Sequence, residues 1–188
     1  MNDAAMVKVW DLFVRVFHWT LVATFIVAYV TAEDFEELHA WVGYLILALV
    51  VVRIVWGFIG SPHARFSSFV TTPAAAFAYA RDAMGGRASR FLGHNPAGGL
   101  MIVLMLIGLI AITVSGIALY AVDEGEGPLA FLLAGAGESM EHLLEEVHEV
   151  LVNLMLGLIA VHIAGVVVES LVHRENLVRA MFTGDKRR

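Results

Sequence analysis

The chain has 188 residues, of which 59% are hydrophobic and only 16% are charged, whereas a soluble domain is usually about half apolar and about a quarter charged. This composition, with a net charge of only −6, indicates a membrane protein. The chain contains no cysteine, which excludes disulfides, thiolate metal sites, c-type haem attachment and cysteine-ligated iron–sulfur clusters.

Four apolar segments follow one another along the chain, each near the roughly twenty residues that a membrane-spanning helix needs. A lipid-exposed span must be a helix or part of a closed barrel, and the sequence has no strand-like alternation. The start, MNDAAMVKVWDLFVRVFHW, has no small-residue cleavage site behind a short apolar core, so we expect the first segment to remain as a span. Asn95 and Pro96 resemble an N-cap followed by proline at the first helical position. The sequence predicts an all-α, integral membrane four-helix bundle as a single domain over residues 1–188, with helices at about 13–32, 38–59, 98–122 and 147–172.

Positive charges are confined to one set of loops. All twelve Lys and Arg lie in the N-terminal arm, in the end of the second segment with the loop 60–97, or in the C-terminal tail. By the positive-inside rule, both termini and the loop 60–97 are cytoplasmic. This long loop contains a predicted short helix at Ala74–Ala83. The opposite face, including the periplasmic loop 123–146, is rich in Asp and Glu, which favours a basic docking partner whose association slows as salt rises.

Two histidines on the fourth segment, His148 and His162, are fourteen residues apart. Fourteen helical steps return to within about 40° of the start and rise about 21 Å, so both imidazoles lie on one face at two depths. His18 lies near the cytoplasmic end of the first segment and His39 near the periplasmic start of the second. Depth therefore pairs His18 with His162, and His39 with His148. Because ionisable residues at membrane depth are costly and usually functional, these pairs suit two haems, each with two axial histidines.

Other interpretations of the histidines differ in what they require. A single zinc or copper site is excluded, because ligand pairs separated by about 21 Å cannot converge on one metal. Two separate two-histidine metal sites stay open, although bis-histidine ligation suits a six-coordinate haem better. A bundle without cofactor, in which the histidines are hydrogen-bonded core residues, also stays open.

Arg53 is the remaining candidate site residue. It lies fourteen residues after His39, on the same helix face and at the depth of the other histidine pair, where a guanidinium could pair with a haem propionate. The alternative is a side chain that snorkels to the cytoplasmic headgroups. Arg15, one turn before His18, is a weaker candidate for the same role.

The remaining histidines and several glycines are less informative. His142 is poorly aligned with His162 on the fourth segment. A role of the loop and tail histidines in a proton or quinone site stays open, although histidines in such places are more often surface residues. Glycines let a flat macrocycle approach a backbone, but they equally let helices pack closely. The residues in question are His63, His94 and His173, and Gly43, Gly108, Gly116, Gly157 and Gly165.

Four segments of the chain together carry a family resemblance. They are VWDLFVRVFHW, LHAWVGYLILALVVVRIVWGFIGSPHARF, LGHNPAGGLMIVLMLIGLIAITVSG and EEVHEVLVNLMLGLIAVHIAGVVVESLVHRENLVRAMFTG. In these segments the sequence resembles the bacterial cytochrome b561 and nickel-hydrogenase cytochrome b-type subunit family of di-haem, four-helix membrane proteins. The resemblance implies that His18 and His162 hold the cytoplasmic-side haem and that His39 and His148 hold the other. It also implies that the protein passes electrons between the quinone pool and a redox partner.

We accordingly expect a multi-pass cytochrome b of the bacterial inner membrane, with two haems b and quinone as its substrate. Electrons would pass between the quinone pool and a periplasmic c-type cytochrome or other redox protein. Hydrogenase subunits of the family commonly extend further beyond the bundle, so a hydrogenase stays open as the partner. A superoxide oxidase that reduces quinone is another alternative, which the acidic face disfavours because its substrate is an anion. Membrane lipid is an expected partner, nucleic acid is not, and a homodimer stays open.

Overall fold

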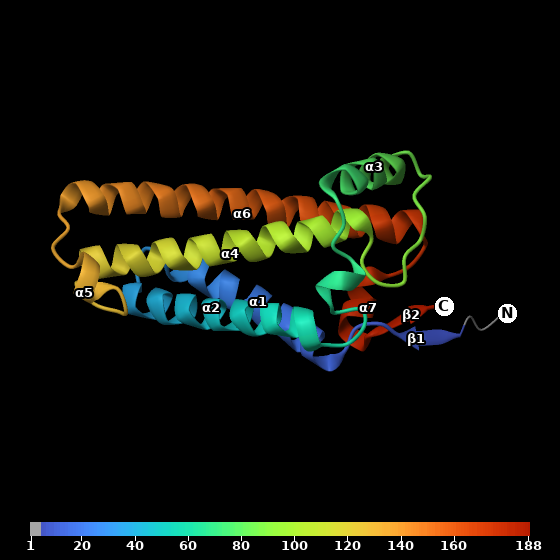
Figure 1. The fold of residues 1–188 in the computed structure, drawn as a ribbon, viewed down its shortest axis with the longest axis horizontal. Helices are drawn as coiled ribbons and strands as arrows, with labels where there is room; N and C mark the ends of the chain where they lie inside the picture. The colour runs from blue at the N-terminus through green and yellow to red at the C-terminus, as the bar shows by residue number, and fades with distance from the viewer. Residues whose placement is uncertain (1–4) are drawn as a thin grey trace. The chain divides into compact units, whose positions relative to one another are not determined.

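A computed structural model describes residues 5–188, and helices dominate it (Figure 1). Four helices are long and apolar enough to cross a membrane, which confirms the all-α membrane class. They are α1 (Leu12–Thr31), α2 (Glu36–Ile59), α4 (Pro96–Asp123) and α6 (Glu138–Val172).

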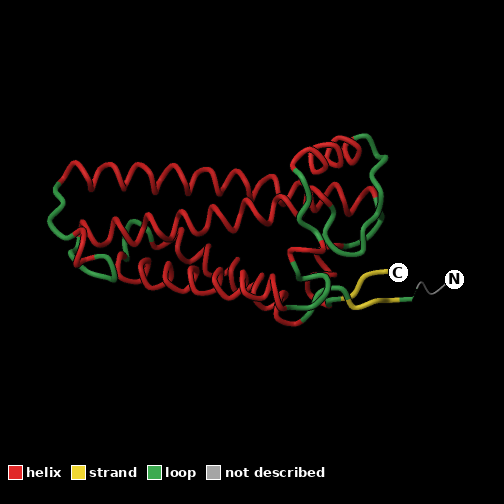
Figure 2. Tube along the Cα trace, viewed as in Figure 1, coloured by secondary structure: helices red, strands yellow, loops and turns green. Residues whose placement is uncertain are grey.

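Shorter elements lie before, between and after the long helices, and Figure 2 distinguishes their types by colour. The segment Pro73–Met84 forms α3, which confirms the helix predicted at Ala74–Ala83. The others are β1 (Met6–Lys8), a 3₁₀ turn (Phe66–Ser68), α5 (Ala130–Leu133), α7 (Leu177–Thr183) and β2 (Asp185–Arg187).

Side-chain caps fix the start of two long helices. The Asp11 carboxylate accepts a hydrogen bond from the Val14 N–H at 2.8 Å at the start of α1. The Asn95 side chain accepts one from the Gly98 N–H at 2.7 Å, and Pro96 is the first residue of α4. This arrangement confirms the cap predicted for the third segment. It satisfies N–H groups that have no partner inside the helix.

The fourth long helix begins earlier than its hydropathy predicts. α6 starts at Glu138 rather than near Val147, so part of the expected loop 123–146 is helical. Glu138 and Glu141 lie in the first turn, where negative charge is stabilised by the helix dipole. A helix can thus continue beyond its apolar stretch, and hydropathy marks only the part that suits lipid.

The packing divides the chain into two units, and each of the four long helices contributes residues to both. Unit 1 contains the chain up to Trp19, Val52–Leu104 and Leu158–Arg188. Unit 2 contains Thr20–Val51 and Met105–Gly157.

Unit 1 joins the two ends of the described chain. β1 pairs antiparallel with β2, and Val9 and Trp10 pack with Ala180 in a buried apolar cluster. The buried Glu175 carboxylate lies 3.0 Å from Arg90 and 3.4 Å from Lys186. Although burial opposes it, these contacts lower the pKa of Glu175. The pair with Arg90 therefore connects the C-terminal tail to the loop that precedes α4, and the pair with Lys186 lies within the tail.

In unit 2, α4 and α6 approach each other closely. Met155 of α6 is fully buried, and its terminal methyl lies 2.7 Å from the position that a Cβ at Gly108 of α4 would occupy. Glycine at position 108 therefore makes room for Met155.

Candidate functional site

The structure brings the four helix histidines together in two pairs. In unit 1, the rings of His18 from α1 and His162 from α6 have their centres 6.4 Å apart. In unit 2, the rings of His39 from α2 and His148 from α6 have their centres 6.1 Å apart. These are the pairs that helix depth predicted. In each pair the two side chains come from different helices, so a group held between them would bridge the helices.

The ring separation is what one metal ion between two imidazoles requires. A metal–imidazole bond is about 2.0 Å long. With about 1.1 Å more from nitrogen to ring centre, two axial histidines of one haem iron place their ring centres about 6.2 Å apart. Two imidazoles in direct hydrogen-bond contact or stacked on each other would be closer. Both observed separations therefore fit two imidazoles that would hold one iron between them.

Hydrogen bonds fix the tautomers of the unit 2 pair. His39 Nδ1 lies 2.8 Å from the Ala28 carbonyl oxygen, which only accepts, so Nδ1 carries the proton. Ser115 Oγ donates to the Ile112 carbonyl at 2.9 Å and therefore accepts from His148 Nδ1 at 3.0 Å. Each Nε2 is left with a free lone pair. Such partners on the second ring nitrogen are typical of metal-ligating histidines.

The unit 1 pair has a different surrounding. Within residues 5–188, His18 Nδ1 is buried without a hydrogen-bond partner. The Trp19 ring meets the His18 imidazole edge-on, with ring centres 5.0 Å apart. Aromatic packing, rather than a second-nitrogen hydrogen bond, therefore orients His18.

Arg53 is buried in unit 1 and does not reach solvent, with only 3% of the residue exposed. One terminal nitrogen donates to the Ala64 carbonyl oxygen at 3.2 Å, and the guanidinium carbon lies 5.5 Å from the centre of the Phe66 ring. The other terminal nitrogen has no partner in the described part of the chain. A buried cation with a free donor fits an anionic group such as a propionate, whereas a snorkelling side chain would be solvated.

Arg15, the weaker candidate for a propionate contact, instead bonds to backbone carbonyl groups in unit 1. Its guanidinium donates to the Phe182 carbonyl oxygen at 2.6 Å and to the Asp11 carbonyl oxygen at 3.4 Å. These bonds join α1 to α7. Arg15 therefore acts as a tie between the N-terminal arm and the C-terminal tail.

His94 is a site residue that the sequence did not single out. Its ring lies between Trp10 and Phe69, with ring centres 4.5 Å and 4.7 Å away, and its Nδ1 is buried without a partner among residues 5–188. Burial first, and then the positive charge of Arg53 and other basic groups, lowers the pKa of His94 to about 3. The one local signal was its position directly before the Asn95 cap, which anchors it at the start of α4.

The remaining histidines stay outside both pairs. The His142 side chain is 72% exposed and lies 3.7 Å from Glu145. His173 lies 3.4 Å from Glu169, whose carboxylate accepts a hydrogen bond from the Tyr79 hydroxyl. His142 thus lies at the surface as expected, whereas the His173 side chain is only 12% exposed.

The structure distinguishes glycines that lie against another side chain from glycines that face open space, which the sequence could not do. A Cβ at Gly116 would lie 2.9 Å from His148 Cε1, so glycine is required for the observed position of that ring. A Cβ at Gly43, Gly157 or Gly165 would meet nothing within 4 Å in the described chain. Gly116 is therefore part of the site, whereas Gly108 serves helix packing.

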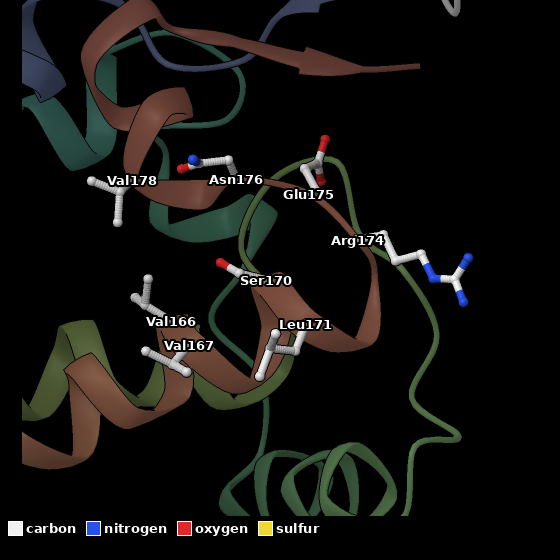
Figure 3. Close-up of a pocket in the computed structure, with 8 residues that line it drawn as sticks. All are labelled: Val166, Val167, Ser170, Leu171, Arg174, Glu175, Asn176 and Val178. Atoms are coloured by element: carbon white, nitrogen blue, oxygen red, sulfur yellow. The ribbon is translucent and has the colours of Figure 1, made fainter.

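A groove of about 390 Å³ lies in unit 1 (Figure 3). Four of the eight residues that line it are aliphatic, and the others are Ser170, Arg174, Glu175 and Asn176 (Figure 3). Val166 is one turn after His162 on α6. The groove therefore begins one helical turn from a member of the unit 1 pair.

Comparison with known proteins identifies a family and several relatives of this chain. The sequence model of the prokaryotic cytochrome b561 family matches residues 9–184. A protein of Rhizobium leguminosarum bv. viciae named "Probable Ni/Fe-hydrogenase B-type cytochrome subunit" is 23% identical over 175 residues, which cover 87% of this chain and 71% of the relative. Proteins of the same name from Azotobacter chroococcum mcd 1 and Azotobacter vinelandii are each 26% identical over 161 residues, covering 78% of this chain and 65% of the relative. No solved structure matches the chain.

Proposed function

The chain belongs to the prokaryotic cytochrome b561 family, and from this premise we propose that it passes electrons between a periplasmic redox partner and the membrane quinone pool through two haems b. Family membership and the four apolar helices make it a multi-pass protein of the bacterial inner membrane. It is a b-type cytochrome that binds haem b and serves electron transport. The number of haems, their ligands, the quinone and the partner are the proposed part.

His18 with His162, and His39 with His148, are the proposed axial ligand pairs. The observation that carries the proposal is the separation of the ring centres, 6.4 Å and 6.1 Å, which fits one iron per pair. Bound haem supplies reversible one-electron chemistry. The chain's own residues orient the imidazoles, through Ala28 and Ser115 in unit 2, and Arg53 supplies a buried cation for a propionate in unit 1.

The groove in unit 1 supports the proposal that the electron acceptor is a quinone dissolved in the membrane. Its aliphatic walls suit an apolar ring and tail, and the Ser170 hydroxyl and the Asn176 amide supply polar contacts for quinone oxygens. The groove begins one turn beyond His162 on α6. We propose that a quinone of the membrane exchanges electrons there.

The periplasmic end is proposed to be the acidic one, with both termini and the loop 60–97 in the cytoplasm. In unit 2, the charge of Glu36 and of neighbouring acidic groups raises the pKa of Glu124, as expected where carboxylates crowd together. Beside them, α5 presents Phe131 with 87% and Leu132 with 69% of their surface exposed. A basic partner with an apolar centre complements this face.

The names of the relatives favour a hydrogenase as the physiological partner. A hydrogenase would deliver electrons to the unit 2 haem in place of a c-type cytochrome. The two partners differ in their source of electrons, so hydrogen gas distinguishes them. In membranes that hold the whole complex, hydrogen reduces the haems only when a hydrogenase is the donor.

The function is tested with the purified protein in liposomes. After reduction by dithionite and its removal, a short-chain quinone is expected to reoxidise both haems, followed by their absorption bands. A basic c-type cytochrome in its reduced form is expected to reduce oxidised haem at a rate that falls with added salt. Haems that stay reduced after quinone addition would refute quinone as the electron acceptor. A rate of haem reduction by the c-type cytochrome that does not change with salt would refute docking at the acidic face.

Ser115→Ala is expected to raise the midpoint potential of the unit 2 haem alone. The variant removes the acceptor for His148 Nδ1–H, and such a hydrogen bond raises the basicity of the ligand and so favours the oxidised iron. A shift of tens of millivolts is about the size of a severalfold change in a one-electron equilibrium. Potentiometric titration followed at the haem bands measures it.

Thr113→Ala is the matched control for Ser115→Ala. Thr113 is buried on α4, and its hydroxyl bonds to the carbonyl oxygens of Leu109 and Ile110. Its loss should leave both potentials unchanged. Equal shifts of both haems in Ser115→Ala, or no shift, would show that Ser115 does not act through His148.

A further inference from the structure

His94 is a half-buried side chain with a buried Nδ1, and the cap that follows it does not account for its role. The Trp10 and Phe69 rings hold its imidazole from two elements, the N-terminal arm and the loop before α3. Its Nδ1 is inaccessible to solvent and has no partner in the described chain. Buried polar groups are nearly always hydrogen-bonded, so this nitrogen points to a bonding group other than the protein residues described.

Arg53 presents the same feature nearby in unit 1. One of its terminal nitrogens is bonded to Ala64 and the other has no partner within residues 5–188. The Arg53 guanidinium lies 5.5 Å from the centre of the Phe66 ring, Phe66 packs edge-on against Phe69 with ring centres 5.8 Å apart, and Phe69 contacts His94, so one aromatic pair connects Arg53 to His94. The free Arg53 nitrogen always donates, and a neutral imidazole protonated at Nδ1 also donates, so one carboxylate can accept from both groups.

We propose that His94 and Arg53 form a cradle for one haem propionate in unit 1, with His94 Nδ1–H donating to the carboxylate. This inference rests on the proposed bis-histidine haem between His18 and His162. His94 acts as a positioning residue, because it contacts the periphery of the haem and not the iron. Arg53 and Lys186 supply positive charge around His94, which stabilises an ionised propionate, and Asp11 is the acidic group whose charge acts on Arg53.

The imidazole acts as a neutral donor. Burial and the surrounding positive charge hold the pKa of His94 at about 3, so the ring is uncharged at neutral pH. The N–H of a neutral imidazole stabilises the negative charge of the propionate through a hydrogen bond, while the imidazole itself stays uncharged. Without the donor, the uncompensated carboxylate disfavours the reduced haem, and the propionate takes up a proton on reduction more readily.

The test compares His94→Leu with His94→Gln in the purified, haem-loaded protein. In His94→Leu, the reduction equilibrium of one haem is expected to fall about tenfold at alkaline pH, which is about 59 mV for a one-electron couple. Its midpoint potential should also depend more steeply on pH. His94→Gln keeps an N–H donor and is expected to restore the wild-type potential and pH profile. His142→Leu, which replaces an exposed histidine, should change neither haem.

Specific outcomes would overturn the cradle. Potentials that are unchanged in His94→Leu, or shifted equally in both haems, would do so. A His94→Gln variant that behaves as His94→Leu would show that the ring acts by packing and not as a donor. If His94→Leu loses haem, the His94→Gln variant decides between the two explanations. A His94→Gln protein with two haems and wild-type potentials supports the cradle, whereas a His94→Gln protein that also loses haem refutes it. Failure of the proposed haem site is distinct, because His162→Ala would then leave the haem content unchanged.

Discussion

His162→Ala is expected to leave one haem b per chain where the wild type holds two. The substitution removes one axial ligand of the unit 1 pair and leaves His39 and His148 intact in unit 2. A haem held by a single histidine loses one of its two bonds to the protein, so its affinity should fall by orders of magnitude. His148→Ala should remove the other haem by the same reasoning, and the double variant should bind none. Pyridine haemochrome content per chain measures all three.

His142→Ala is the matched control on the same helix. His142 lies near the start of α6, it is exposed, and its ring pairs with Glu145. The control should retain two haems with wild-type spectra. Loss of haem in His142→Ala would mean that it, and not His148, is a ligand. A wild type with one haem per chain would refute one pair, and the histidine variant that abolishes binding would identify the other.

The two histidine pairs could be predicted because few properties determine them. Helix periodicity places His148 and His162 on one face, and the distance along each span sets the depth of His18 and His39. Both quantities follow from residue numbers alone. The Asn95 cap was predictable for the same reason, since capping depends on adjacent residues.

Other parts of the site depend on contacts between distant segments. The burial of His94 requires the N-terminal arm and the loop before α3 to converge on it. Ser115 is one of several hydroxyl residues, and only the packing of α4 against α6 brings it to His148. The strands β1 and β2 pair the two ends of the described chain. Each strand has only three residues, which are too few to show the alternation of apolar and polar residues that predicts a strand. The start of α6 was misplaced because hydropathy measures lipid compatibility and not helix formation.

The two proposed haem sites are held by different kinds of interaction. In unit 2, a backbone carbonyl and a serine hydroxyl accept from the two imidazoles, which adjusts the basicity of the ligands. In unit 1, the surrounding groups are the cation Arg53 and the aromatic-packed His94, which act on charge at the haem periphery. The potentials of the two proposed haems therefore depend on different residues.

Gly116→Ala is expected to remove the unit 2 haem while the protein stays folded. An added Cβ would lie 2.9 Å from His148 Cε1 and 3.3 Å from Nδ1, so the ring must move and its bond to Ser115 must break. Overpacking of this kind costs about 1–3 kcal/mol. The gain in helix propensity from glycine to alanine offsets up to about 1 kcal/mol of this. The global fold should thus survive, whereas a displaced ligand cannot reach the iron. Haem content is expected to fall from two per chain to about one, with an unchanged helical circular dichroism spectrum.

Gly108→Ala on the same helix separates this ligand effect from general crowding. Its added Cβ would meet the terminal methyl of Met155 at 2.7 Å, and that flexible end can rotate away at little cost. Gly108→Ala should therefore keep both haems. If Gly116→Ala retains two haems with wild-type potentials, His148 has room that the structure does not give it, and its assignment as a ligand in this position is wrong. If both glycine variants lose haem equally, the contact between α4 and α6, and not the position of one imidazole, governs haem binding in unit 2.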